Sequence, residues 1–184
     1  MKKIIIVFLF CVFSIFAVSG VTYGEITARF YSPKNITTYI PPNHKRTAMM
    51  KRAFAEWSRV TNNKLIFRYV TTPNTAKIKV NFVEKVDTHN KADLQRAIGL
   101  AQHRNTYGGG KGVNRANVWI ADFDQNGRPL AHNIVYTVML HEIGHAIGLN
   151  HSSDYRSIMY PSADEIQEIT KQDLQNLAKI YGWK

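Results

Sequence analysis

The sequence predicts an α+β domain in which five strands and three helices share one core. Three observations lead to this fold class. Segments that alternate apolar and polar residues recur between residues 25 and 121, apolar residues at helical spacing follow the first such segment, and two further helical segments close the chain. A length of 184 residues with a hydrophobic fraction of 45% fits a single domain.

The first twenty residues differ in character from the rest of the chain. After a basic head, an almost wholly apolar run from Ile4 to Val18 ends in small residues at Ser19 and Gly20. This pattern is typical of a signal peptide, and the run is shorter than the ~20 residues of a membrane-spanning helix. We expect residues 1–20 to be removed, residues 21–184 to form the exported domain, and no membrane insertion after cleavage.

The strands and the first helix follow in order. Residues 25–31 alternate as a strand does, and Ser32 and Pro33 stop them. A helix is expected from Lys45 to Val60, because Met50, Phe54 and Trp57 recur at helical spacing and should face the core. The remaining predicted strands are Leu65–Val70, Ala76–Phe82, Ile98–His103 and Asn117–Ala121, with a glycine-rich loop at Tyr107–Gly112 and a second loop at Asp122–Pro129.

Two helices complete the predicted fold. One runs from about Asn133 to Gly148, and the other runs from Thr170 to Ile180. Thr170 followed by Asp173 is typical of a helix start, because threonine caps backbone N–H groups and a carboxylate suits the positive end of the helix dipole.

The first of these two helices carries the most informative motif, H-E-x-x-H-x-x-G-x-x-H, which begins at His141. His141 and His145 lie four residues apart, so both imidazoles reach one metal ion from the same helix face. Gly148 permits the backbone turn that ends a helix and returns His151 as a third ligand. Three imidazoles suit Zn²⁺ and leave a position open for water, from which Glu142 can take a proton. The motif therefore predicts a zinc hydrolase.

The alternative interpretation of this segment is an amphipathic core helix with exposed histidines. The polar residues of the motif crowd a segment that otherwise consists of Ile, Ala, Leu and Gly. Polar groups in so apolar a setting are costly unless something satisfies them, and a metal ion would do so. The metal site is therefore the favoured interpretation.

Met159 lies eight residues after His151, within the run Ser157-Ile158-Met159-Tyr160-Pro161. The histidine motif followed by a methionine turn resembles the metzincin zinc proteases. The Ile-Met-Tyr-Pro form of the turn, together with Ser152 after the third histidine, resembles the matrixin branch. The resemblance covers Val21 to Tyr181 and, away from the histidines, rests on element order and a few local matches.

The resemblance implies a fold and several site residues. The fold is zincin-like: a twisted, mixed five-stranded sheet with an antiparallel edge strand, an N-terminal helix, an active-site helix and a C-terminal helix. Met159 would form an apolar base beneath the three imidazoles. The implied substrate-binding residues are Gly99, Leu100 and Ala101 on the edge strand, and Thr137, Tyr160 and Pro161 around the pocket for the residue after the cleaved bond.

The sequence departs from the family pattern at the accessory metal sites. A second, structural zinc is not supported, because Asp87, His89 and His103 stand in uncertain register and one expected histidine is missing. The glycine-rich loop resembles a calcium site of the family, to which Asp122 or Asp124 could add a carboxylate. It guarantees few of the six to eight oxygens that calcium requires. One catalytic zinc is the expected cofactor, and calcium is left open.

The charge and the cysteine content bear on partners and latency. A formal charge of +11, from 24 basic and 13 acidic side chains, favours anionic surfaces or glycans as neighbours. Nucleic acid is not expected, because no nucleic-acid motif organises the basic residues. The only cysteine, Cys11, lies in the expected signal peptide, so inhibition by a propeptide cysteine, common in this family, is not expected.

These observations together predict a secreted, monomeric zinc endopeptidase that acts on proteins or peptides, with Glu142 as general base and acid. The alternative is a secreted basic binding or adhesion protein that keeps the fold with little or no proteolysis.

Overall fold

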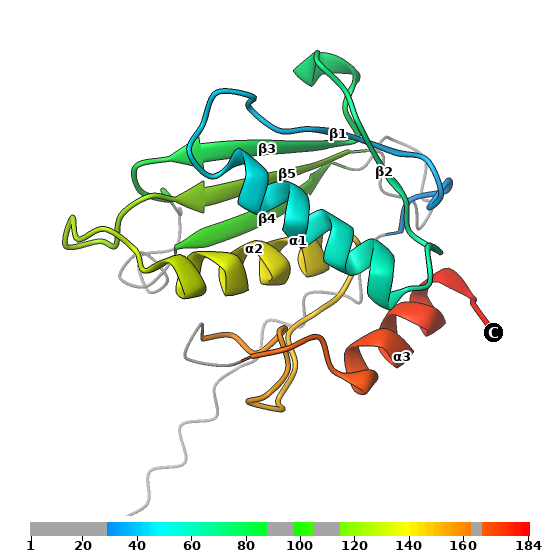
Figure 1. Ribbon diagram of the computed structural model, residues 1–184. Helices are drawn as coiled ribbons and strands as arrows, with labels where there is room; N and C mark the ends of the chain where they lie inside the picture. The colour runs from blue at the N-terminus through cyan, green and yellow to red at the C-terminus, as the bar shows by residue number, and fades with distance from the viewer. Residues whose placement is uncertain (1–28, 88–97, 105–114, 163–166) are drawn as a thin grey trace, which may run out of the picture.

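A mixed sheet in the strand order β2-β1-β3-β5-β4 runs through the computed structural model, which describes residues 29–87, 98–104, 115–162 and 167–184 (Figure 1). The parallel strands are β1 (Ile36–Tyr39), β2 (Phe67–Tyr69), β3 (Ile78–Val83) and β5 (Arg115–Ala121). At one edge β4 (Gly99–Arg104) pairs antiparallel with β5. The predicted mixed sheet with an antiparallel edge strand is therefore confirmed.

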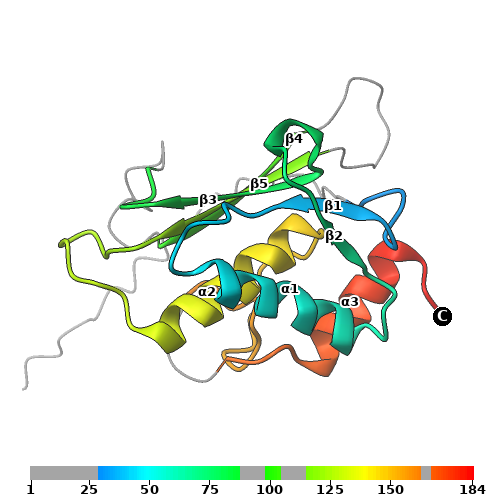
Figure 2. The ribbon, with the colours of Figure 1, turned by 45° about the horizontal axis from the view of Figure 1, so that its top comes forward.

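The helices lie on one face of this sheet. Figure 2 shows α1 (Thr47–Val60) and α2 (His132–Ala146) beneath the strands, with α3 (Lys171–Tyr181) beside them near the C-terminus. The predicted core residues Met50, Phe54 and Trp57 of α1 are fully buried. Because strand residues alternate between the two faces, Ile78 and Val80 of β3 are buried against the helices, while Lys79 between them faces away.

Element boundaries follow the predictions closely, with one exception. The three helices and strands β2 to β5 begin and end within two residues of their predicted positions. A short 3-10 helix, η1 (Pro73–Thr75), precedes β3. None of the helices in the described part of the chain is long and apolar enough to cross a membrane.

The first strand is the exception. Of the strand predicted at 25–31, residues 25–28 lie outside the described residues, and residues 29–31 belong to none of the named strands; β1 is Ile36–Tyr39 instead. Four residues are too short to give a clear alternation signal. The strand is defined by its neighbours, because Ile36 N donates to Ile66 O at 3.0 Å and Lys77 N donates to Thr37 O at 2.8 Å.

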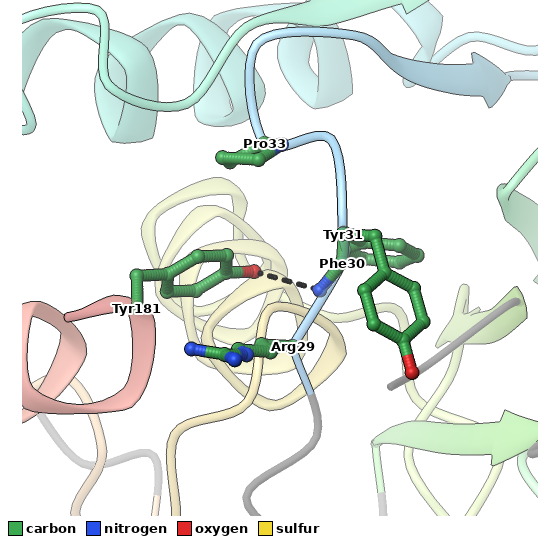
Figure 3. A pocket seen from close by; sticks show the side chains of 5 residues that line it. All are labelled: Arg29, Phe30, Tyr31, Pro33 and Tyr181. Carbon is green, nitrogen blue, oxygen red and sulfur yellow. Dashed lines mark hydrogen bonds between the residues drawn. The ribbon is translucent and has the colours of Figure 1, made fainter. Parts of the chain in front are cut away.

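The segment before β1 packs against the C-terminal helix (Figure 3). The Tyr181 hydroxyl accepts a hydrogen bond from Phe30 N at 3.3 Å and donates one to Ile147 O at 3.1 Å, just beyond the end of α2. Burial raises the pKa of this phenol to about 12. The hollow that Figure 3 shows is lined by Arg29, Phe30, Tyr31, Pro33 and Tyr181 and contains none of the predicted site residues. Tyr181 thus joins both ends of the described chain to the active-site helix.

Candidate metal centre and active site

The end of α2 brings the three motif histidines together. The helix ends at Ala146, and Gly148 has a φ of 114°, a backbone conformation that side-chain-bearing residues rarely adopt. Leu149 N donates to Gly144 O at 2.9 Å and closes the turn. The chain then reverses direction and presents His151 to the two helical histidines, as the motif predicts.

One nitrogen from each of His141, His145 and His151 lies within 4.8 Å of the others. The Nε2 atoms of His141 and His145 are 3.0 Å apart. Nitrogens that share a tetrahedral zinc at about 2.0–2.1 Å lie roughly 3.3 Å from one another, so the spacing fits a single zinc ion. Within the described residues, this is the only group of three or more His, Cys, Asp or Glu side chains placed to hold a metal.

The hydrogen bonds of the two helical histidines fix where their lone pairs point. His141 Nδ1 lies 2.7 Å from Ile158 O, and His145 Nδ1 lies 2.8 Å from Leu149 O. A carbonyl oxygen only accepts, so both Nδ1 atoms must donate, and the Nε2 atom of each neutral ring carries a lone pair. Two lone pairs that face each other at 3.0 Å repel unless a cation lies between them. The arrangement of these side chains therefore fits a bound metal ion.

Burial keeps these imidazoles neutral. Burial, together with the neighbouring histidines, lowers the pKa of His141 to about 4 and that of His145 to about 3. Protonation of one ring, which would relieve the Nε2 repulsion without a metal, is therefore opposed at neutral pH. Neutral imidazole is also the form that binds zinc.

Glu142 lies on α2 next to the first histidine and is almost fully buried, with 6% of its surface exposed. Burial raises the pKa of its carboxyl to about 8. A bound divalent cation would act in the opposite direction and favour the carboxylate. Gly99 of β4 approaches it closely: a Cβ atom at Gly99 would lie 2.5 Å from Glu142 Oε1 and 2.6 Å from Val138 Cγ1. The absence of a side chain at Gly99 therefore leaves room for the Glu142 carboxyl.

The predicted methionine turn lies under the histidine-bearing helix. Met159 is 1% exposed, and a Cβ atom at Gly144 would collide with its Sδ atom and lie 3.2 Å from Trp57 Cζ2. Trp57 Nε1 also donates to Leu140 O at 3.0 Å. Gly144 therefore has a specific steric reason to be glycine, and the role of Met159 as a base beneath the three imidazoles stays a prediction.

A buried side-chain pair anchors this turn to α3, and the sequence analysis missed it. Ser157 Oγ donates to Asp173 Oδ1 at 2.7 Å and accepts from Met159 N at 2.9 Å. Asp173 was expected only as an acidic residue in the first turn of a helix. Its other oxygen does have that role, because Thr170 N donates to Asp173 Oδ2 at 2.9 Å within a capping box. One carboxylate therefore starts α3 and holds the turn whose Ile158 carbonyl orients His141.

The predicted substrate-binding residues lie on β4, on α2 and directly after Met159. Leu100 and Ala101 lie on β4, which has a strand on only one side among the described elements. Thr137 is half-buried one helical turn before His141, and Tyr160 and Pro161 follow Met159, half-buried and exposed respectively. Their assignment to substrate binding stays a prediction.

Where the structure describes them, three residues considered for accessory metal sites make other contacts. His103 lies on the helix side of β4, where its Nε2 is 3.2 Å from Ala146 O, so it braces the end of α2. Asp122 Oδ1 lies 3.0 Å from Arg46 Nε, and Asp124 pairs with Arg128 at 3.2 Å. His89 and the glycine-rich loop lie outside the described residues. Calcium stays an open alternative.

Comparison with known proteins identifies a family and several relatives of this chain. The chain matches the family described as Matrixin over residues 25–182. It is 32% identical to metalloendoproteinase 1 of Glycine max over 71% of this chain and 44% of the relative. It is 28% identical to karilysin of Tannerella forsythia over 91% of this chain and 35% of the relative. It is 29% identical to interstitial collagenase of Oryctolagus cuniculus over 72% of this chain and 27% of the relative. The chain thus spans less than half the length of these proteins.

Proposed function

This chain belongs to the matrixin family, and on that premise we propose that it is a zinc-dependent endopeptidase with its metal held by His141, His145 and His151. The observation that carries the proposal is the pair of Nε2 atoms at 3.0 Å whose lone pairs must face each other. The printed names of the relatives, metalloendoproteinase and collagenase, support the same class of reaction.

Bound zinc would polarise the peptide carbonyl, acidify water and stabilise the developing oxyanion. Glu142 supplies the proton transfers: as a carboxylate it accepts the proton of the attacking water, and as a carboxylic acid it delivers that proton to the leaving amine. The side chain suits both roles, because burial favours its protonated form while a nearby cation favours its ionised form. The close approach of Gly99 limits where the carboxyl can lie.

Substrate binding is proposed along β4 and the end of the methionine turn. An extended peptide would pair with the edge strand through backbone hydrogen bonds near Gly99, Leu100 and Ala101. The residue after the cleaved bond would enter a pocket bounded by Thr137 and Tyr160–Pro161. An apolar side chain is the proposed preference there.

Export is the remaining part of the proposal. The apolar run Ile4 to Val18 with its basic head supports removal of residues 1–20 and secretion of residues 21–184. The mature N-terminus of the exported protein, read by mass spectrometry, tests this part independently of any activity. A secreted protein that begins near Val21 is expected, and retention of Met1 in the membrane fraction would contradict it.

The activity is tested by exposing residues 21–184 to an unbiased peptide library, with and without a zinc chelator. We expect cleavage that the chelator abolishes and added zinc restores, with a preference on the side after the cut. A folded, zinc-loaded protein that cleaves none of the library peptides would contradict the proposal and favour a binding protein that keeps the fold.

A further inference from the structure

We propose that the sheet face opposite the helices binds a linear sulfated glycan along a row of cations formed by Arg68, Lys77 and Arg115. The face lies behind the metal centre, and α1 and α2 cover only the other side of the strands (Figure 2). The proposal is independent of proteolysis. It depends on the proposed export at one point only: an exported protein meets glycans, and this is why a glycan is chosen over other polyanions.

The alternation of each strand identifies the side chains on this outer face. In β1 Ile36 and Thr38 are buried, so Thr37 and Tyr39 face away from the helices. In β5 Ala116 and Val118 are buried, so Arg115 and Asn117 face outward. In β2 the Phe67 ring packs on Phe54 of α1, with 4.8 Å between ring centroids, which turns Arg68 outward. The same alternation turns Lys77 and Lys79 outward beside β3.

The backbone register aligns these cations across the sheet. Arg68 of β2 lies opposite Thr37 of β1. Lys77 N donates to Thr37 O at 2.8 Å, and Ala116 N donates to Lys77 O at 2.7 Å, which places Arg115 next in line. The row crosses β2, β1, β3 and β5 at right angles to the strands. Three inter-strand spacings of about 4.8 Å give it a length of roughly 14 Å.

A second row runs beside the cations and is built for hydrogen bonding. The register aligns Tyr39 with Lys79, Lys79 with Asn117, and Asn117 with Gln102. Two amides and a phenol can each donate to and accept from sugar hydroxyls, and Lys79 adds a further cation. Sulfate groups and hydroxyls alternate along a sulfated glycan, so cations flanked by amides match its chemistry.

The outer face carries no opposing charge in the described strands. None of β1 to β5 contains an aspartate or glutamate. Among the described residues, Arg68, Lys77, Lys79 and Arg115 form no ion pair with a carboxylate. The carboxylates of α1 and of the loops at Asp122–Arg128 and Asp154–Arg156 are instead paired with arginines. The positive potential of this face is therefore not neutralised from within these strands.

The side chains favour a glycan over single-stranded nucleic acid. Proteins that bind single strands stack successive bases on several aromatic rings. On the outer face of the described strands, the two rows hold the ring of Tyr39 on β1, and the adjacent row holds that of Trp119 on β5. These two rings lie on different strands and in different rows, with β3 between them, so they form no series of adjacent rings for successive bases.

The experiment compares two triple variants with equal loss of charge. Arg68→Gln/Lys77→Gln/Arg115→Gln neutralises the cation row of the outer face, and Lys51→Gln/Lys171→Gln/Lys179→Gln removes three exposed lysines from α1 and α3. The dissociation constant for heparin is measured for residues 21–184 over a range of salt concentrations. Each lost contact lowers the slope of log K against log salt by about 0.7 to 0.9, so we expect a drop of roughly 2 to 3 for the outer-face variant alone. Its affinity at physiological salt should fall at least tenfold.

Four further measurements complete the test. Desulfated heparin should fail to bind, and single-stranded DNA of equal charge should compete at least tenfold more weakly than heparin. Equal weakening in the two triple variants, or equal competition by DNA, would overturn the proposal, because either result would reflect net charge alone. Cleavage of a small peptide and the melting temperature should match wild type in the outer-face variant. These readouts separate a failure of glycan binding from a failure of the protease assignment.

Discussion

At the scale of single residues, the candidate metal centre depends on which ring nitrogen of His141 and of His145 carries the proton. The Nδ1–H groups of His141 and His145 donate hydrogen bonds to the carbonyls of Ile158 and Leu149, and both Nε2 lone pairs are left free to bind a metal ion. The spacing of the motif predicts that these rings converge. It does not reveal the two carbonyls, because they come from residues whose identity leaves no signal in the sequence.

Gly144 provides a residue-scale prediction. Alanine is usually more stable than glycine in a helix by about 1 kcal/mol. Here the added methyl group would collide with the buried Met159 side chain and crowd Trp57. We expect Gly144→Ala to lower the free energy of unfolding by about 1–3 kcal/mol, the usual range for overpacking a core, and to weaken zinc binding. Chemical denaturation and zinc competition measure both effects.

Gly182→Ala is the matched control for this substitution. Gly182 has a φ of 68°, and a methyl group added there would have no neighbour within 4 Å, so its replacement strains the backbone without touching the site. It should lower stability and leave zinc affinity unchanged. If Gly144→Ala instead stabilises the protein as an ordinary helical substitution would, the packing of Met159 against α2 is not as tight as described.

At the scale of elements, α3 supports the methionine turn through the hydrogen bond between Asp173 and Ser157. Ser157→Ala removes the link between Asp173 and the methionine turn and keeps the capping box intact. We expect a loss of about 1–2 kcal/mol in stability, because Asp173 keeps a buried oxygen without its partner, and a several-fold weaker affinity for zinc. Thr170→Val is the control: it should destabilise α3 by about 1 kcal/mol and leave zinc affinity unchanged. Equal zinc affinity in wild type and Ser157→Ala would refute the support role.

Tyr181 gives a prediction for alkaline pH. Its pKa is about 12 in the folded protein and about 10 in an unfolded chain, so the folded state holds the phenolic proton more tightly. The stabilisation that this group contributes is complete below pH 10 and is lost as the pH rises towards 12. Tyr181→Phe should be less stable at pH 8 by about 1 kcal/mol, through its lost hydrogen bonds. The difference between the two proteins, measured by urea denaturation, should shrink from about pH 10 upward; a constant difference would contradict the assignment.

The elements also show where sequence reasoning succeeds and where it fails. The helices were predictable because apolar spacing in α1, the histidine motif in α2 and the Thr170 cap in α3 are local signals. Strand β1 could not be predicted in this way, because its four residues form a strand only through pairing with β2 and β3. His103 shows the same limit: its position on the helix side of β4 follows from sheet register.

At the scale of the whole molecule, a zinc ion held by His141, His145 and His151 would join α2 to the turn that follows it. Binding to the folded state alone adds RT ln(1 + [Zn]/Kd), which is about 4 kcal/mol at a thousandfold excess over Kd. Removal of the metal with a chelator should lower the melting temperature of wild type by several degrees, and a His151→Ala variant should show a much smaller change. A melting temperature that the chelator leaves unaltered in wild type would argue against a metal held by these three histidines.

The two faces of the sheet differ in the kinds of side chain that they carry. The helix side carries the buried core and the metal centre, whereas the outer side carries cations and amides without carboxylates in its strands. A formal charge of +11 predicts that the protein attracts anions, but it does not say where on the surface they bind. The location appears only when register aligns Arg68, Lys77 and Arg115, which are far apart in the chain.

The most direct test of the central claim measures zinc content and peptide cleavage in the same preparations of wild type and Glu142→Gln. Glutamine keeps the shape of the side chain and cannot accept the proton. We predict one zinc per chain in both proteins, with cleavage at least about a hundredfold slower in the variant, the scale expected for loss of a general base. Zinc-loaded Glu142→Gln that cleaves as fast as wild type would contradict the account, as would a wild-type protein that binds no zinc.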